Sequence, residues 1–153
     1  SFKAATGRIR VLPNIQISQP SRRSVLTVGC FDPFHVGHLY HLQEARKMGD
    51  PLVVAVTKDN FVHKGKGRPI FRDVERMKVI QALAIVDDVI IVESSIEALA
   101  LIKPRYFVVG YEYKHKVREE DASYCRAQNI EIIFTNEQTY SSTKIVNILL
   151  ELT

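Results

Sequence analysis

The chain has 153 residues, of which 46% are hydrophobic and 25% charged, as is typical of a soluble globular protein. Its formal net charge of +4 suits a site for small polyanions, and no segment interleaves basic with aromatic residues as RNA-binding segments do. No hydrophobic run approaches the ~18 residues that a membrane span needs, so we expect neither a nucleic-acid nor a membrane partner.

The first 24 residues predict an arm or linker ahead of a domain that spans residues 25–153. Within that arm, residues 8–17 alternate weakly and would suit an edge strand. The chain begins without a methionine, which indicates a trimmed chain or a piece of a longer one. Cys30 and Cys125 are too few for a disulfide framework, so we expect a cytoplasmic location.

From residue 25 onward, short apolar runs alternate with segments of helical spacing. The apolar runs predict buried strands at residues 25–28, 51–56, 86–92, 106–110 and 130–134. The segments between and after them predict helices at residues 36–48, 73–85, 96–102, 117–128 and 141–152. Five strand–helix units predict an α/β, Rossmann-like fold, in which a five-stranded parallel sheet carries helices on both faces. Ligands of such sheets bind beyond the carboxyl ends of the strands.

The segment GCFDPFHVGH, residues 29–38, joins the first strand to the first helix and carries the clearest functional signal. Gly37 permits close approach at the start of that helix, whose free N–H groups attract phosphate. His35 and His38 can donate hydrogen bonds to phosphate oxygens and stabilise charge in a phosphoryl transition state. Two alternatives stay open: packed histidines under a loop, and a zinc site with Cys30, although zinc needs three or four ligands.

The same segment resembles the signature of the cytidylyltransferase-like nucleotidyltransferases, which carry the pattern His-x-Gly-His. Two more segments resemble motifs of this family in the expected order: KGKGRPI at residues 64–70, followed by Glu75-Arg76, and YSSTKI at residues 140–145. The resemblance extends from about residue 24 to the C-terminus. It implies that a phosphorylated acceptor attacks the α-phosphorus of a nucleoside triphosphate and that pyrophosphate leaves.

The resemblance also implies roles for individual residues. Those that would act in catalysis are His35, His38, Lys64 and Lys66. Those that would bind the nucleotide are Gly29, Cys30, Phe31, Asp32, Gly37, Arg76, Gly110, Glu112, Tyr140, Ser141, Ser142 and Thr143. Those that would bind the acceptor are Asp32, Lys64, Tyr113 and Lys114. Mg²⁺ is the expected cofactor, carried by the triphosphate with no side-chain ligand assigned.

Each of these residues also has a structural interpretation. The lysines of residues 64–66 would be solvated in a glycine-rich loop, and Ser141 would cap a helix. Asp32 would form a turn, and Arg76 would pair with Asp73 on a helix surface. Two further histidines are expected to lie at the surface or in packing, His41 and His63.

Within the family, the segments around the second strand and the second helix resemble those of the heptose-1-phosphate adenylyltransferases. GYEYK at residues 110–114 is similar to their Gly-Gly-Asp-Tyr segment, but Tyr111 and Glu112 depart from it, which leaves the sugar open. Glycerol-3-phosphate cytidylyltransferases carry Arg-Thr-Glu-Gly-Ile before the last motif, whereas residues 136–140 lack the arginine. The resemblance therefore favours ATP over CTP and a sugar 1-phosphate, such as heptose 1-phosphate, as the acceptor.

Three other functions stay open at this point. The chain could be a CTP-dependent cytidylyltransferase for glycerol 3-phosphate or a related phosphate, or an adenylyltransferase like the FAD synthetases, which share the Gly-Tyr pair at residues 110–111. It could also be a nucleotide-binding module without activity, against which four intact residues argue: His35, His38, Lys64 and Lys66. The expected assembly is a homodimer, because dimers are the commonest soluble oligomers.

Overall fold

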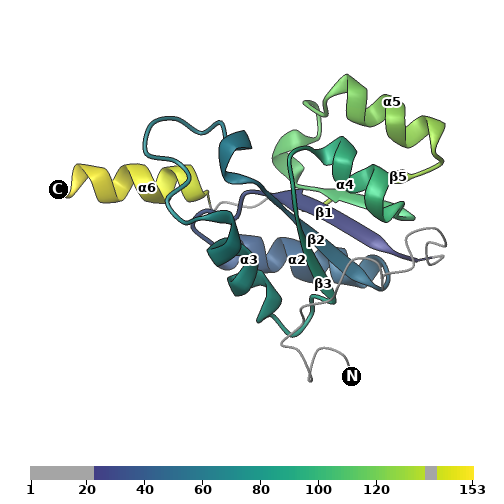
Figure 1. The fold of residues 1–153 in the computed structure, drawn as a ribbon, viewed down its shortest axis with the longest axis horizontal. Helices are drawn as coiled ribbons and strands as arrows, with labels where there is room; N and C mark the ends of the chain where they lie inside the picture. The colour runs from purple at the N-terminus through teal and green to yellow at the C-terminus, as the bar shows by residue number, and fades with distance from the viewer. Residues whose placement is uncertain (1–22, 137–140) are drawn as a thin grey trace.

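A five-stranded parallel sheet forms the centre of this computed structural model, which describes residues 23–136 and 141–153 (Figure 1). Its strands lie in the order β3-β2-β1-β4-β5, and every neighbouring pair is parallel. The strands are β1 (Val25–Gly29), β2 (Leu52–Thr57), β3 (Asp88–Val92), β4 (Tyr106–Val109) and β5 (Glu131–Phe134). The α/β fold with five parallel strands, predicted from the alternating pattern, is confirmed.

The central strands are apolar on both faces because helices cover both sides of the sheet. Val25 of β1 belongs to a core cluster on one face, where it packs with Leu42 and Ile80. The next residue, Leu26, belongs to a second cluster on the opposite face, with Leu99 among its members. Successive side chains of a strand point to opposite faces, so a strand buried on both sides reads as a continuous apolar run.

The helices divide between the two faces of the sheet, apart from the last one (Figure 1). On one face lie α2 (Val36–Met48) and α3 (Asp73–Gln81), and on the other lie α4 (Ser95–Ile102) and α5 (Glu119–Ala127). The last helix, α6 (Ser142–Glu151), extends away from the sheet. Two short 3₁₀ turns that the pattern did not predict follow β2 and β4: η2 (Asp59–Phe61) and η3 (Tyr111–Tyr113).

Helix α3 ends four residues before the predicted boundary, although the sequence up to Ile85 keeps helical spacing. Beyond Gln81 the backbone tightens, because Leu83 N–H donates to the Ile80 carbonyl and Val86 N–H donates to the Leu83 carbonyl. Such i to i+3 bonds turn the chain into β3 within a few residues. Apolar spacing alone cannot distinguish this turn from a continued helix.

The order of the strands creates a crevice between β1 and β4. From β1 the chain moves outward through β2 to β3 and then returns to the other side of β1, so the connections of β1 and β4 leave in opposite directions. The loops that follow the strands therefore meet at one edge of the sheet. No helix in the described ranges is long and apolar enough to cross a membrane.

Some predictions fall on residues outside the described ranges. The edge strand at residues 8–17 lies there entirely, and the proposed boundary at residue 24 lies next to the first described residue. The division into an arm and a domain over residues 25–153 thus stays a prediction.

Candidate functional site

A cavity of about 570 Å³ opens at the crevice beyond the carboxyl ends of β1 and β4. Its size suits a small-molecule ligand. Residues far apart in the sequence line it, because the loops after the strands and the first turns of four helices converge there. The residues predicted to be functional that line it are Gly29, Cys30, Phe31, His35, Gly37, His38, Lys64, Gly110, Glu112, Tyr113, Ser141 and Ser142.

The two histidines of the His-x-Gly-His segment form a capping box at the start of α2. Gly37 N–H donates to His35 Nδ1 at 3.0 Å, and His35 N–H donates to His38 Nδ1 at 3.1 Å. A capping box needs its two side chains three positions apart, which explains the spacing of the pair. The two rings stack with their centroids 3.8 Å apart. The motif therefore builds its own helix N-terminus and fixes both imidazoles beside it.

These contacts also fix the protonation of the rings. Each Nδ1 accepts a backbone hydrogen bond, so a neutral ring carries its proton on Nε2. Burial lowers the pKa of His38 to about 3, with further lowering by His35, His41 and Lys64. Burial, followed by the charge of Lys64, lowers the pKa of His35 as well. Without a ligand both imidazoles are neutral near pH 7, and His38 offers an Nε2–H donor at the cavity.

His41, predicted to lie at the surface or in packing, is packed between two threonines and also lines the cavity. Its two ring nitrogens lie 2.6 Å from Thr27 Oγ1 and 3.2 Å from Thr135 Oγ1. It thereby bridges β1 to the residue that follows β5. Burial lowers its pKa to about 4, so the bridge is uncharged near pH 7. Sequence spacing could have placed His41 on the face of α2 that holds His38, but only the fold supplies the two threonines.

The glycine-rich loop after β2 brings one of its two lysines to the cavity. Lys64 is part of the lining, whereas Lys66 is exposed outside it. Gly65 and Gly67 have φ angles of +102° and +78°, which residues with a Cβ rarely adopt. The alternation of lysine with glycine thus follows from the turns of this loop. Of the two lysines predicted to act in catalysis, Lys64 therefore lies at the cavity and Lys66 does not.

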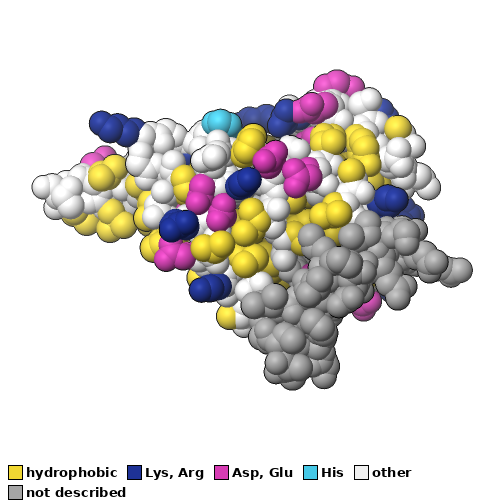
Figure 2. All heavy atoms as spheres, in the orientation of Figure 1, with side chains coloured by type: hydrophobic (Ala, Val, Ile, Leu, Met, Phe, Trp, Pro, Cys, Tyr) yellow, Lys and Arg dark blue, Asp and Glu magenta, His cyan; other side chains and the backbone are white. Residues whose placement is uncertain are grey.

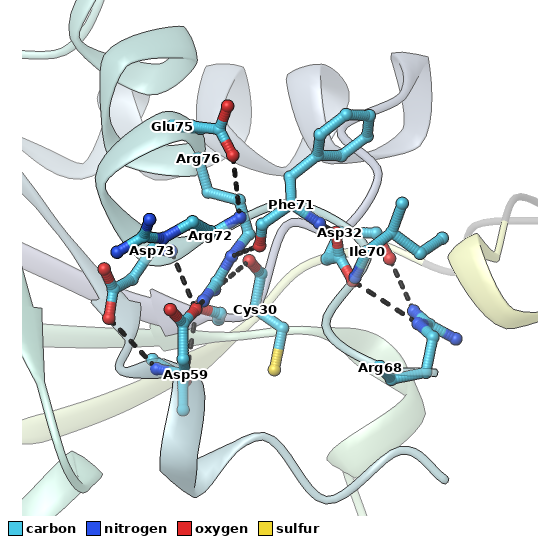
Figure 3. A network of polar contacts seen from close by, with 12 residues as sticks. Cys30, Asp32, Asp59, Arg68, Ile70, Phe71, Arg72, Asp73, Glu75 and Arg76 are labelled. Carbon is cyan, nitrogen blue, oxygen red and sulfur yellow. Dashed lines mark hydrogen bonds and ion pairs between the residues drawn. The ribbon is translucent and has the colours of Figure 1, made fainter. Parts of the chain in front are cut away.

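Asp32 is only 1% exposed and does not line the cavity. Its carboxylate accepts hydrogen bonds from Ile70 N–H at 2.6 Å, Phe71 N–H at 2.9 Å and Arg68 Nε at 3.3 Å (Figure 3). These contacts tie the motif turn to the end of the loop that carries Lys64. Asp32 is more than a turn former, but it holds the loops together and does not face the ligand space.

Arg76 is 2% exposed and forms the other half of this network (Figure 3). Its guanidinium donates to the Phe71 carbonyl at 2.8 Å, the Cys30 carbonyl at 2.9 Å and Asp59 Oδ1 at 2.7 Å. All three guanidinium nitrogens are therefore bound within the protein. The structure does not bring Arg76 to the cavity, and it does not pair with Asp73 on the helix surface.

The first turn of α6 closes the cavity beside the histidines. Ser141 caps the helix by accepting from Lys144 N–H at 3.3 Å, and Ser142 Oγ donates to the Pro33 carbonyl at 2.9 Å. The second bond joins α6 to the motif turn. Thr143 is exposed and lies outside the lining, whereas Lys144, which was not predicted, is part of it. Tyr140, predicted to bind nucleotide, lies outside the described residues.

The loop after β4 contributes three of the predicted residues to the cavity lining, Gly110, Glu112 and Tyr113. Burial raises the pKa of Tyr113, with smaller contributions from Glu112 and Cys30. A Cβ on Gly110 would lie 2.7 Å from the Glu112 carboxylate, so glycine lets the loop fold back over itself. Lys114, predicted to bind the acceptor, lies outside the lining with its ammonium 5.7 Å from the Tyr111 ring centroid.

The cavity is lined by more cations than carboxylates. The cations are Lys64, Lys116, Arg118 and Lys144, and the carboxylates are Glu112 and Asp121. Together with the positive end of the α2 helix dipole, this excess favours a polyanionic ligand. No group of three histidine, cysteine, aspartate or glutamate side chains in the described ranges could hold a metal ion, so Cys30, His35 and His38 do not form a zinc site.

The family model described as cytidylyltransferase-like matches residues 26–148. A curated relative named bifunctional protein HldE, from Desulfatibacillum aliphaticivorans, is 40% identical over 114 residues, which are 68% of this chain and 23% of that protein. The protein of the same name from Campylobacter jejuni strain RM1221 is 31% identical over 134 residues, or 85% of this chain and 28% of that protein. The chain thus spans about a quarter of the length of these curated relatives.

Solved structures also resemble the chain. The lipopolysaccharide core biosynthesis protein from Thermoplasma volcanium aligns with a TM-score of 0.63 and 29% identity, over 77% of this chain and 98% of that one. Pantothenate synthetase from Thermus thermophilus aligns with the same TM-score of 0.63 but 16% identity, over 90% of this chain and 67% of that one. At that identity the second likeness concerns the fold alone.

Proposed function

Because the chain belongs to the cytidylyltransferase-like family, a family of nucleotidyltransferases, we propose that it transfers the nucleoside monophosphate part of a triphosphate to a small phosphorylated acceptor. The observation that carries this proposal is the capping box of His35 and His38 at the switch point of the sheet. It joins a helix N-terminus to two neutral imidazoles with protons on Nε2, which is a site for phosphate oxygens.

In the proposed reaction, an oxygen of the acceptor phosphate attacks the α-phosphorus and forms a new phosphorus–oxygen bond. The bond from the α-phosphorus to the oxygen that bridges it to the β-phosphate breaks, and pyrophosphate leaves with the electron pair. No proton has to be removed from the attacking phosphate, so the site needs no strong base. Donation from the imidazoles and the charge of Lys64 would stabilise the pentacoordinate phosphorus, and Ser141, Ser142 and Lys144 would hold the β- and γ-phosphates.

We propose Mg²⁺ as the cofactor, bound mainly to triphosphate oxygens and water. This arrangement is common for Mg²⁺, which retains several waters and often binds through substrate phosphates. When bound it would neutralise charge on the triphosphate. Glu112 lines the cavity and is a carboxylate that could reach one of its waters.

ATP is the proposed donor and heptose 1-phosphate the proposed acceptor. Both follow from the resemblance of residues 45–56 and 75–92 to heptose-1-phosphate adenylyltransferases. The likeness to a lipopolysaccharide core biosynthesis protein supports a sugar acceptor, since lipopolysaccharide is built from sugars. CTP with glycerol 3-phosphate is the second candidate, and FAD synthetase-like activity or a non-catalytic module are the alternatives. A cytoplasmic location and a homodimer also stay proposals.

The test is pyrophosphate release by the full chain with ATP or CTP and a panel of sugar and polyol phosphates, with and without EDTA. We expect turnover with ATP and heptose 1-phosphate that EDTA abolishes. Turnover only with CTP and glycerol 3-phosphate would select the second candidate. Tight binding of a triphosphate without release of pyrophosphate from any pair would favour a non-catalytic module.

A further inference from the structure

Helix α5 contributes a buried carboxylate to the lining of the cavity. Asp121, the third residue of α5, is 6% exposed and is part of the cavity lining. Among the described residues, none donates a hydrogen bond to its Oδ1 atom, which is itself buried. Taking a carboxylate out of water without a donor is unfavourable unless something else supplies one.

The first turn of α5 has two other acidic residues, so the helix does not depend on Asp121 for negative charge at its N-terminus. Glu119 and Glu120 also lie in the first turn, where negative charge stabilises the helix, and both are exposed. Glu119 pairs with Arg126 at 2.9 Å, and Glu120 pairs with Arg118. Asp121 is the member of the three that turns inward to the ligand space. Burial raises its pKa, an effect that the charge of Arg118 partly opposes.

The position of Asp121 relates it to the acceptor side of the reaction. Ser142 is tied to Pro33 in the motif turn before α2, and this end of the cavity would hold the leaving pyrophosphate. Asp121 comes from α5, on the other face of the sheet. An in-line attack requires the acceptor phosphate to approach the α-phosphorus from the side opposite to the pyrophosphate. The rest of the acceptor then extends toward the wall that holds Asp121, Lys116 and Ser95.

The neighbouring charges indicate which chemical group would meet the carboxylate. Lys116 and Arg118, from the segment that leads into α5, also line the cavity, and their positive charge disfavours an acceptor with an ammonium group. Neutral hydroxyls can donate to a carboxylate without this repulsion, while the two cations attract the phosphate of the acceptor. Resting on the proposed function, we propose that Asp121 binds the hydroxyl groups of a sugar or polyol phosphate acceptor and thereby selects it.

The test compares wild type, Asp121→Asn and the matched control Glu119→Gln, which changes an exposed acidic residue of the same helix turn whose partner, Arg126, lies outside the cavity lining. The probes are ATP with Mg²⁺ and whichever of heptose 1-phosphate and glycerol 3-phosphate the wild type turns over. We expect Asp121→Asn to raise KM for the acceptor by roughly tenfold or more, as loss of hydrogen bonds to a charged group does. KM for ATP should change less than about twofold, and Glu119→Gln should resemble the wild type.

A second measurement uses acceptor analogues that each lack one hydroxyl. If Asp121 binds a hydroxyl, the wild type should lose affinity for one analogue, whereas Asp121→Asn should bind that analogue and the parent acceptor almost equally. The melting temperature of Asp121→Asn should stay equal or rise, because the variant no longer buries a charge.

Three results would overturn the inference while leaving the proposed function intact. An increase in KM for ATP alone would assign Asp121 to the nucleotide or its metal ion. Unchanged kinetics in a turning-over enzyme would make the residue a packing element. A fall in melting temperature with equal losses for both substrates would make it structural. Absence of turnover in the wild type with every pair would instead overturn the proposed function, and this inference with it.

Discussion

At the scale of single residues, the site depends on side chains whose polar atoms are already engaged by the protein. The Nδ1 atoms of His35 and His38 accept backbone hydrogen bonds, so only one tautomer of the neutral ring is compatible with the loop. Donors fixed in this way need no reorganisation when charge develops on a phosphoryl group. The same engagement explains why the pair cannot be moved to another spacing without losing the helix start.

His38→Ala should lower kcat by about 100-fold or more, because a fixed hydrogen-bond donor to the transition state is lost. Part of the capping box is lost as well, so unfolding should become easier by about 1 kcal/mol. Steady-state kinetics and a denaturant titration measure the two effects separately. The control is His63→Ala, since His63 is exposed and outside the cavity lining. A change in kcat of only a few-fold would contradict a role in the transition state.

The two lysines of the glycine-rich loop should differ, although both match the family motif. Lys64→Ala should lower kcat more than it weakens ATP binding, because Lys64 lines the cavity near the histidines. Lys66→Ala should leave both quantities within a few-fold of the wild type, since Lys66 lies outside the lining. Single-turnover rates and ATP titrations provide the comparison. Equal losses in both variants would mean that the loop rearranges when ligand binds.

His41 should make folding stability depend on pH. Its pKa is lowered from 6.5 to about 4, so the folded state prefers the neutral ring. The resulting stabilisation is complete above pH 6.5 and is lost as the pH falls to about 4, in total roughly 3 kcal/mol. Denaturant unfolding of wild type and His41→Leu across this range measures the difference. The variant should show a shallower loss toward acid pH, with the contributions of His35 and His38 left, and parallel curves would refute the assignment.

At the scale of elements, the site is assembled by contacts between segments that follow different strands. Asp32 and Arg76 join the turn after β1 to the loop between β2 and α3, and Ser142 joins α6 to the same turn (Figure 3). Asp32 and Arg76 do not line the cavity, and their role is to hold Lys64 and the histidines in one arrangement. Ser142 lines the cavity and also fixes the start of α6 against the motif turn.

Replacing Arg76 tests whether its hydrogen bonds hold the turn after β1 to the loop between β2 and α3. Arg76→Met should lower the free energy of unfolding by about 3 kcal/mol, because the carbonyls of Cys30 and Phe71 and the carboxylate of Asp59 lose their donor. The control Arg72→Met removes an exposed arginine from the preceding loop and should change stability little. Activity of the folded variant should fall without a selective change in KM for ATP. A selective loss of ATP binding with normal stability would instead indicate that Arg76 contacts the phosphates of ATP directly.

At the scale of the whole molecule, the surface is unusual where α6 extends from the sheet. Figure 2 shows hydrophobic side chains along this helix and over α3. The large hydrophobic side chains exposed on α6 and on the residue after it are Ile148, Leu149, Leu150 and Leu152, which are between 57% and 77% accessible. An exposed apolar surface of this kind suits a protein interface, and the proposed homodimer would be one way to cover it.

The proposed dimer can be tested on this helix. Light scattering should give the mass of two chains for the wild type, and Leu149→Glu should shift the protein toward one chain, because burying the new charge is unfavourable. Lys103→Glu changes an exposed residue at the end of α4 and serves as the control. A wild type that is monomeric at all concentrations would refute the homodimer and leave the apolar surface for another partner.

The sequence by itself determined the parts of this protein that depend on local or periodic information. Short apolar runs identified the five strands, most clearly at Leu52–Thr57, because a strand buried on both faces carries apolar side chains at successive positions. The spacing of His35 and His38 marked the candidate site, since the pair builds a local motif within one helix turn. The lysine–glycine alternation of residues 64–67 marked the loop, because the positive φ angles of Gly65 and Gly67 are a local requirement of its turns.

The tertiary structure alone decided which residues face the ligand space. Arg76 and Asp32 matched the family motif, yet their hydrogen bonds run to backbone groups brought close by folding. His41 reads as an ordinary histidine until Thr27 and Thr135 come to lie on either side of it. Asp121 reads as one of three acidic residues in a helix turn, and burial against the cavity distinguishes it. Burial and hydrogen bonding between distant segments are properties of the packed chain, so no local pattern encodes them.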